Sequence, residues 1–160
     1  MEYRKATLVD LEKIWDKDIA KHNGDLRYVN WKKQYIENNL NGKCTTFVVL
    51  NNDDPVGQIT ILFSPECSPV KDKPLLCNGT DTANMNAFRI EKAYEGGGHI
   101  STLVKMAETY AKEHGIKHLT IGAEARESRN LGIYLHWGYN QFVMHEIYEG
   151  DLVVYYKKDI

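Results

Sequence analysis

The spacing of apolar residues over the first 42 residues predicts a short strand followed by two amphipathic helices. Residues 3–6 have the composition of a strand, and Thr7 followed by Asp10 three residues later is typical of a capped helix start. Asn-Gly-Asp at 23–25 then breaks the helical pattern, and Asn-Gly at 41–42 ends a second one. The apolar stripes of the two helices are Leu8, Leu11, Ile14, Trp15 and Ile19, and then Trp31, Tyr35, Ile36 and Leu40.

The middle of the chain predicts a β-hairpin and then a long loop. Residues 45–50 and 56–63 are rich in β-branched and apolar side chains, and turn-forming residues at 51–55 separate them. Residues 64–81 show no clear apolar periodicity. A loop of this length either forms a wall of a binding site or is a passive excursion, and both interpretations stay open.

The second half of the chain alternates strands and helices around a run of three glycines. A strand pattern over 84–93 precedes the glycines at 96–98, and the helix that follows leads to another strand at 117–122. A short helix over 128–136 comes next. The last two strands flank a turn at 149–151.

The resulting order, β-α-α-β-β-β-α-β-α-β-β, fits one domain. The chain has 160 residues, close to the roughly 150 expected per domain, and shows no repeat or linker. The strand–helix–strand unit over 84–122 requires parallel pairing, whereas the other connections suit antiparallel neighbours. We therefore predict a single domain over residues 1–160 of the α+β class, with a mixed, mostly antiparallel sheet and helices on both faces.

Composition and charge narrow the range of functions. Lys and Arg number 20 against 22 Asp and Glu, a net charge of −2 with both signs interspersed, which disfavours a nucleic-acid partner. No stretch approaches the roughly 18 apolar residues of a membrane span, and the N-terminus lacks the apolar run of a signal peptide. We therefore expect a cytoplasmic protein with no membrane partner.

The cysteines and histidines do not predict a metal site. The spacing of Cys44, Cys67 and Cys77 matches no common zinc pattern, so we expect reduced or buried thiols. His114 and His118 are four residues apart, but they straddle the helix-ending Gly115 and would not share one helical face.

Three consecutive glycines between a strand and a helix indicate an anion-binding turn. Glycine permits backbone conformations that a Cβ forbids, and the amides at a helix start lie at the positive end of the helix dipole. A turn without a ligand is the alternative. A Walker loop would continue with Gly-Lys-Ser/Thr, whereas this chain has Gly98-His99-Ile100-Ser101. A dinucleotide fingerprint fits only in its first half, because Ser101 replaces the last glycine.

Two segments in this region carry a resemblance to a known family. The first reads FRIEKAYEGGGHIS from Phe88 to Ser101, and the second reads IYLHWGY over 133–139, with Tyr134 four residues before Gly138. In this order and spacing they resemble the acetyl-CoA-binding motif and the second motif of the GNAT superfamily of N-acetyltransferases. The resemblance covers roughly residues 84–140, and the strand and helix order outside it agrees.

The resemblance implies a GNAT-like acyl-CoA N-acyltransferase fold, with acetyl-CoA as co-substrate and no metal. It implies that two parallel strands, near 88–92 and 119–124, splay apart and that the pantetheine amides bond to the backbone of the first. An amide near Ile90 would polarise the thioester carbonyl. The residues implied to bind the co-substrate are Phe88, Ile90, Glu95, Gly96, Gly97, Gly98, His99, Ile100 and Ser101.

Acetyl transfer also needs an unprotonated amine and a proton for the departing thiolate. By resemblance Tyr134 is the general acid, since a phenol keeps its proton at neutral pH. The alternative for Tyr134 is an aromatic side chain with a packing role only. Glu124 is the first candidate for the general base and Glu91 the second. Either could instead be a solvated or ion-paired carboxylate, with a bound water relaying the proton.

The leading hypothesis is therefore an N-acetyltransferase that acts on a primary amine of a small molecule or peptide. The acceptor is open, and so is the oligomeric state, with a homodimer among the alternatives. Acidic walls would suit a polyamine, and Asp16, Asp18 and Asp25 are available. The resemblance implies that the acceptor pocket is walled by the early helices and last strands, with Trp31, Tyr35, Glu146 and Tyr148 as candidates.

Two other functions stay open. The family usually has Arg or Gln where this chain has Glu95, and often Asn where it has Glu127. These departures favour a catalytically degenerate module of the same fold that binds acyl-CoA as a sensor or assembly subunit. Gly96-x-Gly98 by itself suggests a dinucleotide-linked oxidoreductase.

Overall fold

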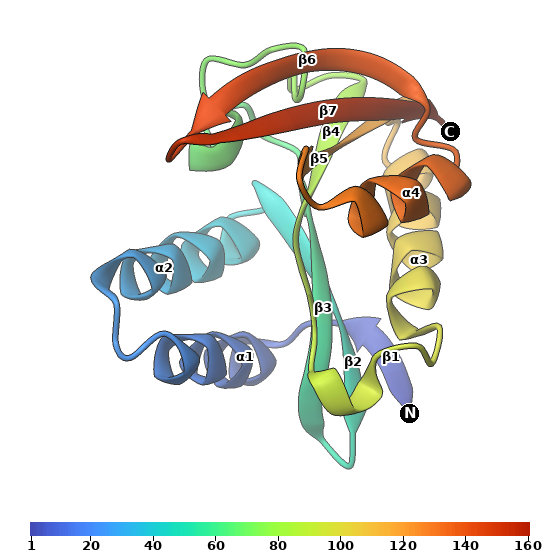
Figure 1. Cartoon of the computed structure of the whole chain (residues 1–160). Helices are drawn as coiled ribbons and strands as arrows, with labels where there is room; N and C mark the ends of the chain where they lie inside the picture. Colours follow the sequence, from blue (N-terminus) through green and yellow to red (C-terminus); the bar gives the residue numbers. More distant parts are fainter. The chain divides into compact units, whose positions relative to one another are not determined.

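Seven strands and four α-helices alternate along the chain in the predicted order (Figure 1). The computed structural model describes residues 1–160. The strands are β1 Glu2–Lys5, β2 Cys44–Asn51, β3 Asp54–Leu62, β4 Thr82–Ile90, β5 His118–Glu124, β6 Gln141–Tyr148 and β7 Asp151–Asp159. The helices are α1 Leu8–Lys21, α2 Leu26–Leu40, α3 His99–Glu113 and α4 Ser128–His136.

The strands are hydrogen-bonded in the order β1-β2-β3-β4-β5-β7-β6. β4 and β5 pair in parallel, whereas β1–β2, β5–β7 and β6–β7 pair antiparallel. The predicted α+β class with a mixed, mostly antiparallel sheet is confirmed. None of the helices is long and apolar enough to cross a lipid bilayer.

Contacts divide the chain into two compact units. Unit 1 comprises residues 1–60 and 87–107, and unit 2 comprises residues 61–86 and 108–160. Each unit is discontinuous in sequence because β3, β4 and α3 run through both. That residues 1–160 act as a single domain stays a prediction.

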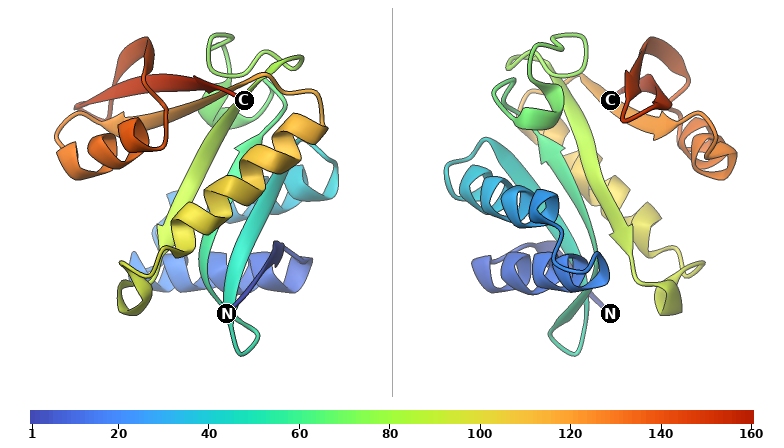
Figure 2. Two further views of the ribbon diagram at one scale, coloured as in Figure 1. Left: turned by 90° about the vertical axis from the view of Figure 1, so that its right-hand side faces the viewer. Right: turned by 60° about the vertical axis from the view of Figure 1, so that its left-hand side comes forward.

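Unit 1 is built on strands β1 to β3. Helices α1 and α2 lie on one face of these strands, and the first turns of α3 lie on the other (Figure 2). Every residue of β2 from Cys44 to Leu50 is buried, which explains why this strand lacks the apolar–polar alternation of a strand with one wet face. Leu11, Ile14 and Trp15 of α1 are also buried.

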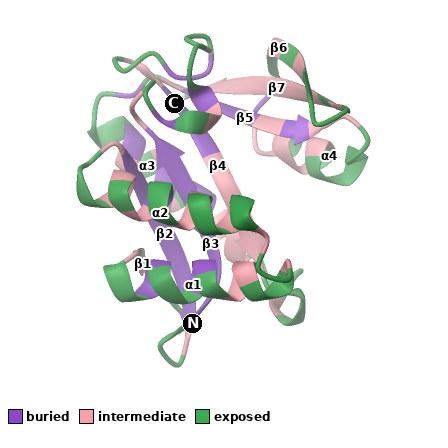
Figure 3. Cartoon of the chain, turned by 90° about the vertical axis from the view of Figure 1, so that its left-hand side faces the viewer, coloured by how far each residue is buried: buried purple, intermediate pink, exposed green.

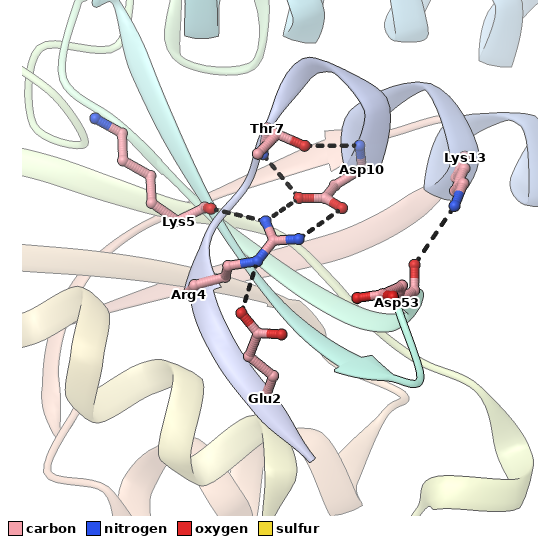
Figure 4. Close-up of polar contacts among 7 residues, drawn as sticks. All are labelled: Glu2, Arg4, Lys5, Thr7, Asp10, Lys13 and Asp53. Atoms are coloured by element: carbon pink, nitrogen blue, oxygen red, sulfur yellow. Dashed lines mark hydrogen bonds and ion pairs between the residues drawn. The ribbon is translucent and has the colours of Figure 1, made fainter.

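The start of α1 is fixed by the predicted cap. The Thr7 hydroxyl accepts a hydrogen bond from the Asp10 amide, and the Asp10 carboxylate accepts one from the Thr7 amide (Figure 4). Arg4 of β1 adds an ion pair to the same carboxylate. Strand and helix are therefore joined by a local network that the sequence indicates only in part.

Unit 2 contains β5, β6 and β7, the start of β4, α4 and the end of α3. The antiparallel ladder between β5 and β7 is long, from His118 opposite Asp159 to Glu124 opposite Val153. The predicted loop over 64–81 contains only a 3₁₀ turn at Ser68–Val70, and it buries Leu76 and Cys77. The three cysteines are buried, as predicted, and none of them forms a disulfide.

β4 differs from its prediction at both ends. It begins at Thr82 and ends at Ile90, whereas the sequence suggested residues 84–93. The Glu91 amide still donates to the Val56 carbonyl oxygen of β3, but residues 92–94 then form a 3₁₀ turn. The chain therefore leaves the sheet after Glu91 and continues through this turn to the glycines that precede α3.

Candidate active site

The glycine loop leads into α3 with no side chain capping the helix. The Thr102 amide donates the first helical hydrogen bond, 3.0 Å from the Gly98 carbonyl oxygen, so Gly98 is the N-cap residue. The amides of His99, Ile100 and Ser101 come before that first donor. Backbone donors at this position of a helix have no partner within the helix. An anion is the ligand that suits them best.

Two of the glycines are required by the path of the backbone. Gly96 and Gly98 have φ angles of 77° and 76°, in the left-handed region that disfavours residues with a Cβ. A Cβ built on either would meet no atom within 4 Å, so crowding by the protein is not what selects glycine. The space beside both residues is open, and a ligand phosphate could approach the backbone there.

His99 is held against the loop and β1. Its Nδ1 lies 2.6 Å from the Tyr3 hydroxyl oxygen, and its ring also lies against Tyr94. A Cβ at Gly97 would lie 2.7 Å from His99 Nε2, so the ring covers that glycine directly. The side chain of His99 therefore packs on the helix start.

β4 changes character at Ala87. This residue has a φ of 55° in the middle of a strand, an uncommon conformation for a residue with a side chain. Ala83–Met85 are buried, whereas residues 86–90, which include Ala87 itself, are half-buried. The parallel ladder with β5 ends at the pair Met85–Ile121. Phe88 and Ile90 therefore lie beyond the ladder, and Ile90 Cδ1 would be 2.8 Å from a Cβ on Gly57 of β3.

Tyr134 lies near the end of α4, in unit 2. Its side chain is half-buried and contacts the Trp137 ring, with 5.8 Å between ring centroids. Burial raises the pKa of Tyr134 to about 12. The hydroxyl therefore keeps its proton across the physiological pH range, as a general acid must before it acts.

Tyr134 and Gly138 are four residues apart because both belong to the C-terminal turn that ends α4. The Gly138 amide donates to the Leu135 carbonyl oxygen, and the Tyr139 amide donates to that of Tyr134, each at 3.0 Å. With Gly138 at a φ of 97°, this is a Schellman motif. The Tyr139 side chain is then fully buried and its hydroxyl donates to Glu108 of α3 at 2.9 Å. The motif thus fixes α4 and the position of Tyr134 on it.

The two candidate bases both have cationic partners. The Glu124 carboxylate accepts from Arg126 Nε at 2.9 Å, and the side chain is 38% exposed. Glu91 pairs with Lys17 at 2.7 Å. Both are thus ion-paired carboxylates in the structure. Either could act as a general base only if its cationic partner moves away or if water reaches the carboxylate.

Comparison with known proteins places the chain in a family. The sequence profile of the acetyltransferase (GNAT) family matches residues 8–139. This chain belongs to the GNAT family. The predicted family is therefore confirmed, and the profile reaches far beyond the two motifs that indicated it. No curated protein matches the chain significantly.

Solved GNAT-fold structures share the fold over nearly the whole chain. A ribosomal-protein-alanine N-acetyltransferase from Brucella melitensis has a TM-score of 0.71 at 16% identity, with both chains covered completely. A PaiA N-acetyltransferase from Thermoplasma acidophilum in complex with coenzyme A has a TM-score of 0.63 at 16% identity, covering 99% of this chain and 98% of that one. A spermidine N-acetyltransferase chimera from Vibrio cholerae and hSSAT gives 0.70 at 14% identity, covering 99% and 96%.

This GNAT protein keeps the predicted co-substrate residues together within unit 1. Phe88 and Ile90 lie at the end of β4, and residues 95–101 form the loop and first turn of α3. Tyr134 and Glu124 lie in unit 2, on α4 and at the end of β5. The roles of all these residues stay predictions. No three His, Cys, Asp or Glu side chains gather in a way that could hold a metal ion.

The candidate acceptor-wall residues have mixed positions. Tyr35 is buried at 6% exposure, with its ring 4.9 Å from that of Trp15, so it belongs to the core of unit 1 rather than to a wall. Trp31 is half-buried and contacts Tyr28. Glu146 pairs with Lys73 of the 64–81 loop at 2.8 Å, and the Tyr155 hydroxyl donates to it at 2.7 Å. Burial alone would raise the pKa of Glu146, but these partners hold it below its ordinary value.

Sequence reasoning missed a half-buried cation within the predicted co-substrate strand, Arg89 of β4. The guanidinium of Arg89 lies over the Trp15 ring, 3.8 Å from the centroid, and forms an ion pair with Asp18 of α1. Burial lowers the pKa of Arg89, and the charge of Asp18 opposes that shift. One signal was visible, since Arg89 stands between the apolar Phe88 and Ile90 in a strand.

Proposed function

We propose that the protein is an acetyl-CoA-dependent N-acetyltransferase that acetylates a primary amine. Membership of the GNAT family supports the reaction class. The start of α3 is the observation that supports acetyl-CoA as the co-substrate. The N-cap residue Gly98 has no side chain to cap the helix, and the amides of residues 99–101 precede the first helical donor. These amides would hold the diphosphate of coenzyme A.

The chemistry proceeds by direct attack. The neutral amine nitrogen forms a bond to the thioester carbonyl carbon, the oxyanion collapses, and the carbon–sulfur bond breaks. Tyr134 gives its hydroxyl proton to the departing thiolate, and the amine loses a proton to Glu124 or to water. The β4 backbone from Phe88 to Ile90 would bond the pantetheine amides and polarise the carbonyl. The raised pKa of Tyr134 supports this role, because the phenol is protonated when the thiolate forms.

The first experiment measures thermal stabilisation by acetyl-CoA, free CoA, NAD and ATP. A ligand at one hundred times its dissociation constant should stabilise the folded protein by about 2.7 kcal/mol. We expect acetyl-CoA and CoA to stabilise it and NAD and ATP not to do so. If NAD were the only ligand that stabilises the protein, the result would contradict the transferase proposal and favour a dinucleotide-linked oxidoreductase.

The second experiment measures thiol release with a panel of amines. Tyr134→Phe should lower turnover by about 10²-fold or more, the usual contribution of a general acid, while acetyl-CoA affinity is retained. Tyr156→Phe is the matched control, since this β7 tyrosine contacts Phe142 on the neighbouring β6 strand. Equal turnover in the two variants would remove Tyr134 from the mechanism.

A degenerate acyl-CoA-binding module is the second candidate. It is favoured by the exposed Glu95, whose carboxylate precedes Gly96 in the loop that would hold the diphosphate. In that case acetyl-CoA stabilises the protein but no amine in the panel releases thiol.

A further inference from the structure

Helix α2 carries an apolar stripe on the side that faces away from the core of unit 1. Leu26, Val29 and Leu40 are 74%, 41% and 70% exposed, and Ile36 of the same stripe is half-buried. Their spacing of three, seven and four residues is that of alternate a and d positions in a heptad, with Lys33 at the remaining position. Figure 3 draws much of α2 in the colour of exposed residues. A single helix seldom keeps such a stripe uncovered in water.

Two charged side chains of the stripe region, Lys33 and Glu37, have no ion-pair partner within the chain. The stripe forms a shallow groove whose lining includes Lys33, Glu37 and the apolar residues Val29, Ile36 and Leu40. Lys32, on the side facing α1, already pairs with Asp16 at 2.7 Å. Lys33 and Glu37 are exposed, and neither forms an ion pair with another residue of the chain. Lysine one turn before glutamate is also the less favourable order for a pair on one helix.

We propose that α2 pairs with α2 of a second copy of this chain, antiparallel and across a two-fold axis. In this register Val29 packs against Leu40 of the partner subunit, and the stem of Lys33 packs against Ile36 of the partner subunit. The ammonium of Lys33 then reaches Glu37 of the partner subunit. The two-fold axis repeats each contact, so one stripe satisfies itself twice.

The charge pattern favours this occupant and this direction. A parallel pair would place Lys33 against Lys33 of the partner subunit, a like-charge contact at the centre of the interface. The antiparallel pair instead gives each Lys33 an acidic partner, and both unpaired charges are used. One helix from each copy buries less area than a standard interface of about 1,600 Å², so we expect a dissociation constant in the micromolar range. This inference does not depend on the proposed reaction.

The test is sedimentation equilibrium of the full chain with two charge reversals. Lys33→Glu makes both charges of the stripe negative, and Glu37→Lys makes both positive. Each variant alone should dimerise at least about tenfold more weakly than the wild-type chain, because the two-fold axis now opposes like charges. An equimolar mixture of the two variants should recover the dimer as a heterodimer. That recovery also shows that both variants are folded.

Matched controls separate the stripe from general effects. Lys71→Glu reverses an exposed charge in unit 2, and Leu75→Ser removes an exposed leucine outside α2. Both should dimerise like the wild-type chain, whereas Leu40→Ser should weaken the dimer. Three results would overturn the proposal: a wild-type chain that stays monomeric up to about 1 mM, single reversals that dimerise normally, or a mixture that does not recover.

Discussion

The ion pair between Arg89 and Asp18 should contribute measurably to stability, because it joins β4 to α1 in a nearly closed environment. The two side chains are 22% and 16% exposed, and the guanidinium also covers Trp15, which is 2% exposed. Arg89→Met retains an unbranched apolar side chain but leaves the Asp18 carboxylate without its cation. Asp18→Asn leaves the guanidinium charged and mostly buried.

The expected cost follows from that burial. Removing one partner of a fully buried pair lowers the free energy of unfolding by about 3–5 kcal/mol. With about a fifth of each side chain in water, we expect about 2–3 kcal/mol for Arg89→Met, of which about 1 kcal/mol is the lost contact with the Trp15 ring. For a chain of this size each kcal/mol lowers the melting temperature by about 2–4 °C.

The assay is urea unfolding of the wild-type chain, the two single variants and the double variant. The double variant leaves no unpaired charge, so its loss should be smaller than the sum of the single losses by about 1 kcal/mol or more. Lys13→Met is a control for removing an exposed cation that bonds only to the carbonyl oxygen of Asp53. Additive single losses, or losses below about 0.5 kcal/mol, would refute the reasoning.

Three further predictions concern the loop, the helix cap and a thiol. Glu95→Gln removes a carboxylate beside the glycines and should tighten acetyl-CoA binding severalfold, more so at low salt; unchanged affinity in titration calorimetry would show that the carboxylate lies away from the diphosphate. Burial alone would raise the pKa of Asp10, but hydrogen bonds from Arg4 and Thr7 hold it below its ordinary value. The stability from Asp10 is therefore present above the unfolded pKa and lost as pH falls through the lower, folded pKa. Asp10→Asn should be destabilising at pH 7 in thermal unfolding, with the gap to the wild type closing below about pH 4, whereas a constant gap would contradict this. Burial raises the pKa of Cys77 to about 11, so the native chain should not react with iodoacetamide at pH 8 and should do so in urea; rapid labelling of the native chain at Cys77 would contradict the buried position.

The order of the helices and strands could be predicted from the amino-acid sequence, because each of these elements depends on local patterns. The cap at Thr7 and the glycine run at 96–98 are signals within a few residues of the structure they cause. The helix over 128–136 has the predicted bounds, since Gly138 ends it through contacts with its own last turn. The GNAT motifs are likewise short segments, and the family could be predicted from them.

The contacts between residues of distant segments could not be predicted from local patterns, because they form only when the chain folds. Arg89 contacts α1 about seventy residues earlier in the chain, and no local pattern announces Trp15 and Asp18 as its partners. The left-handed φ of Ala87 likewise has no sequence signal, because glycine is the residue expected there. Tyr35 follows the same rule: its helical spacing marks a buried stripe, but whether the stripe faces a core or a pocket depends on what packs against it. The role of a side chain depends on contacts with residues that are distant in the sequence, and these form only on folding. The helices and strands depend mainly on residues that are close in the sequence, so local patterns predict them.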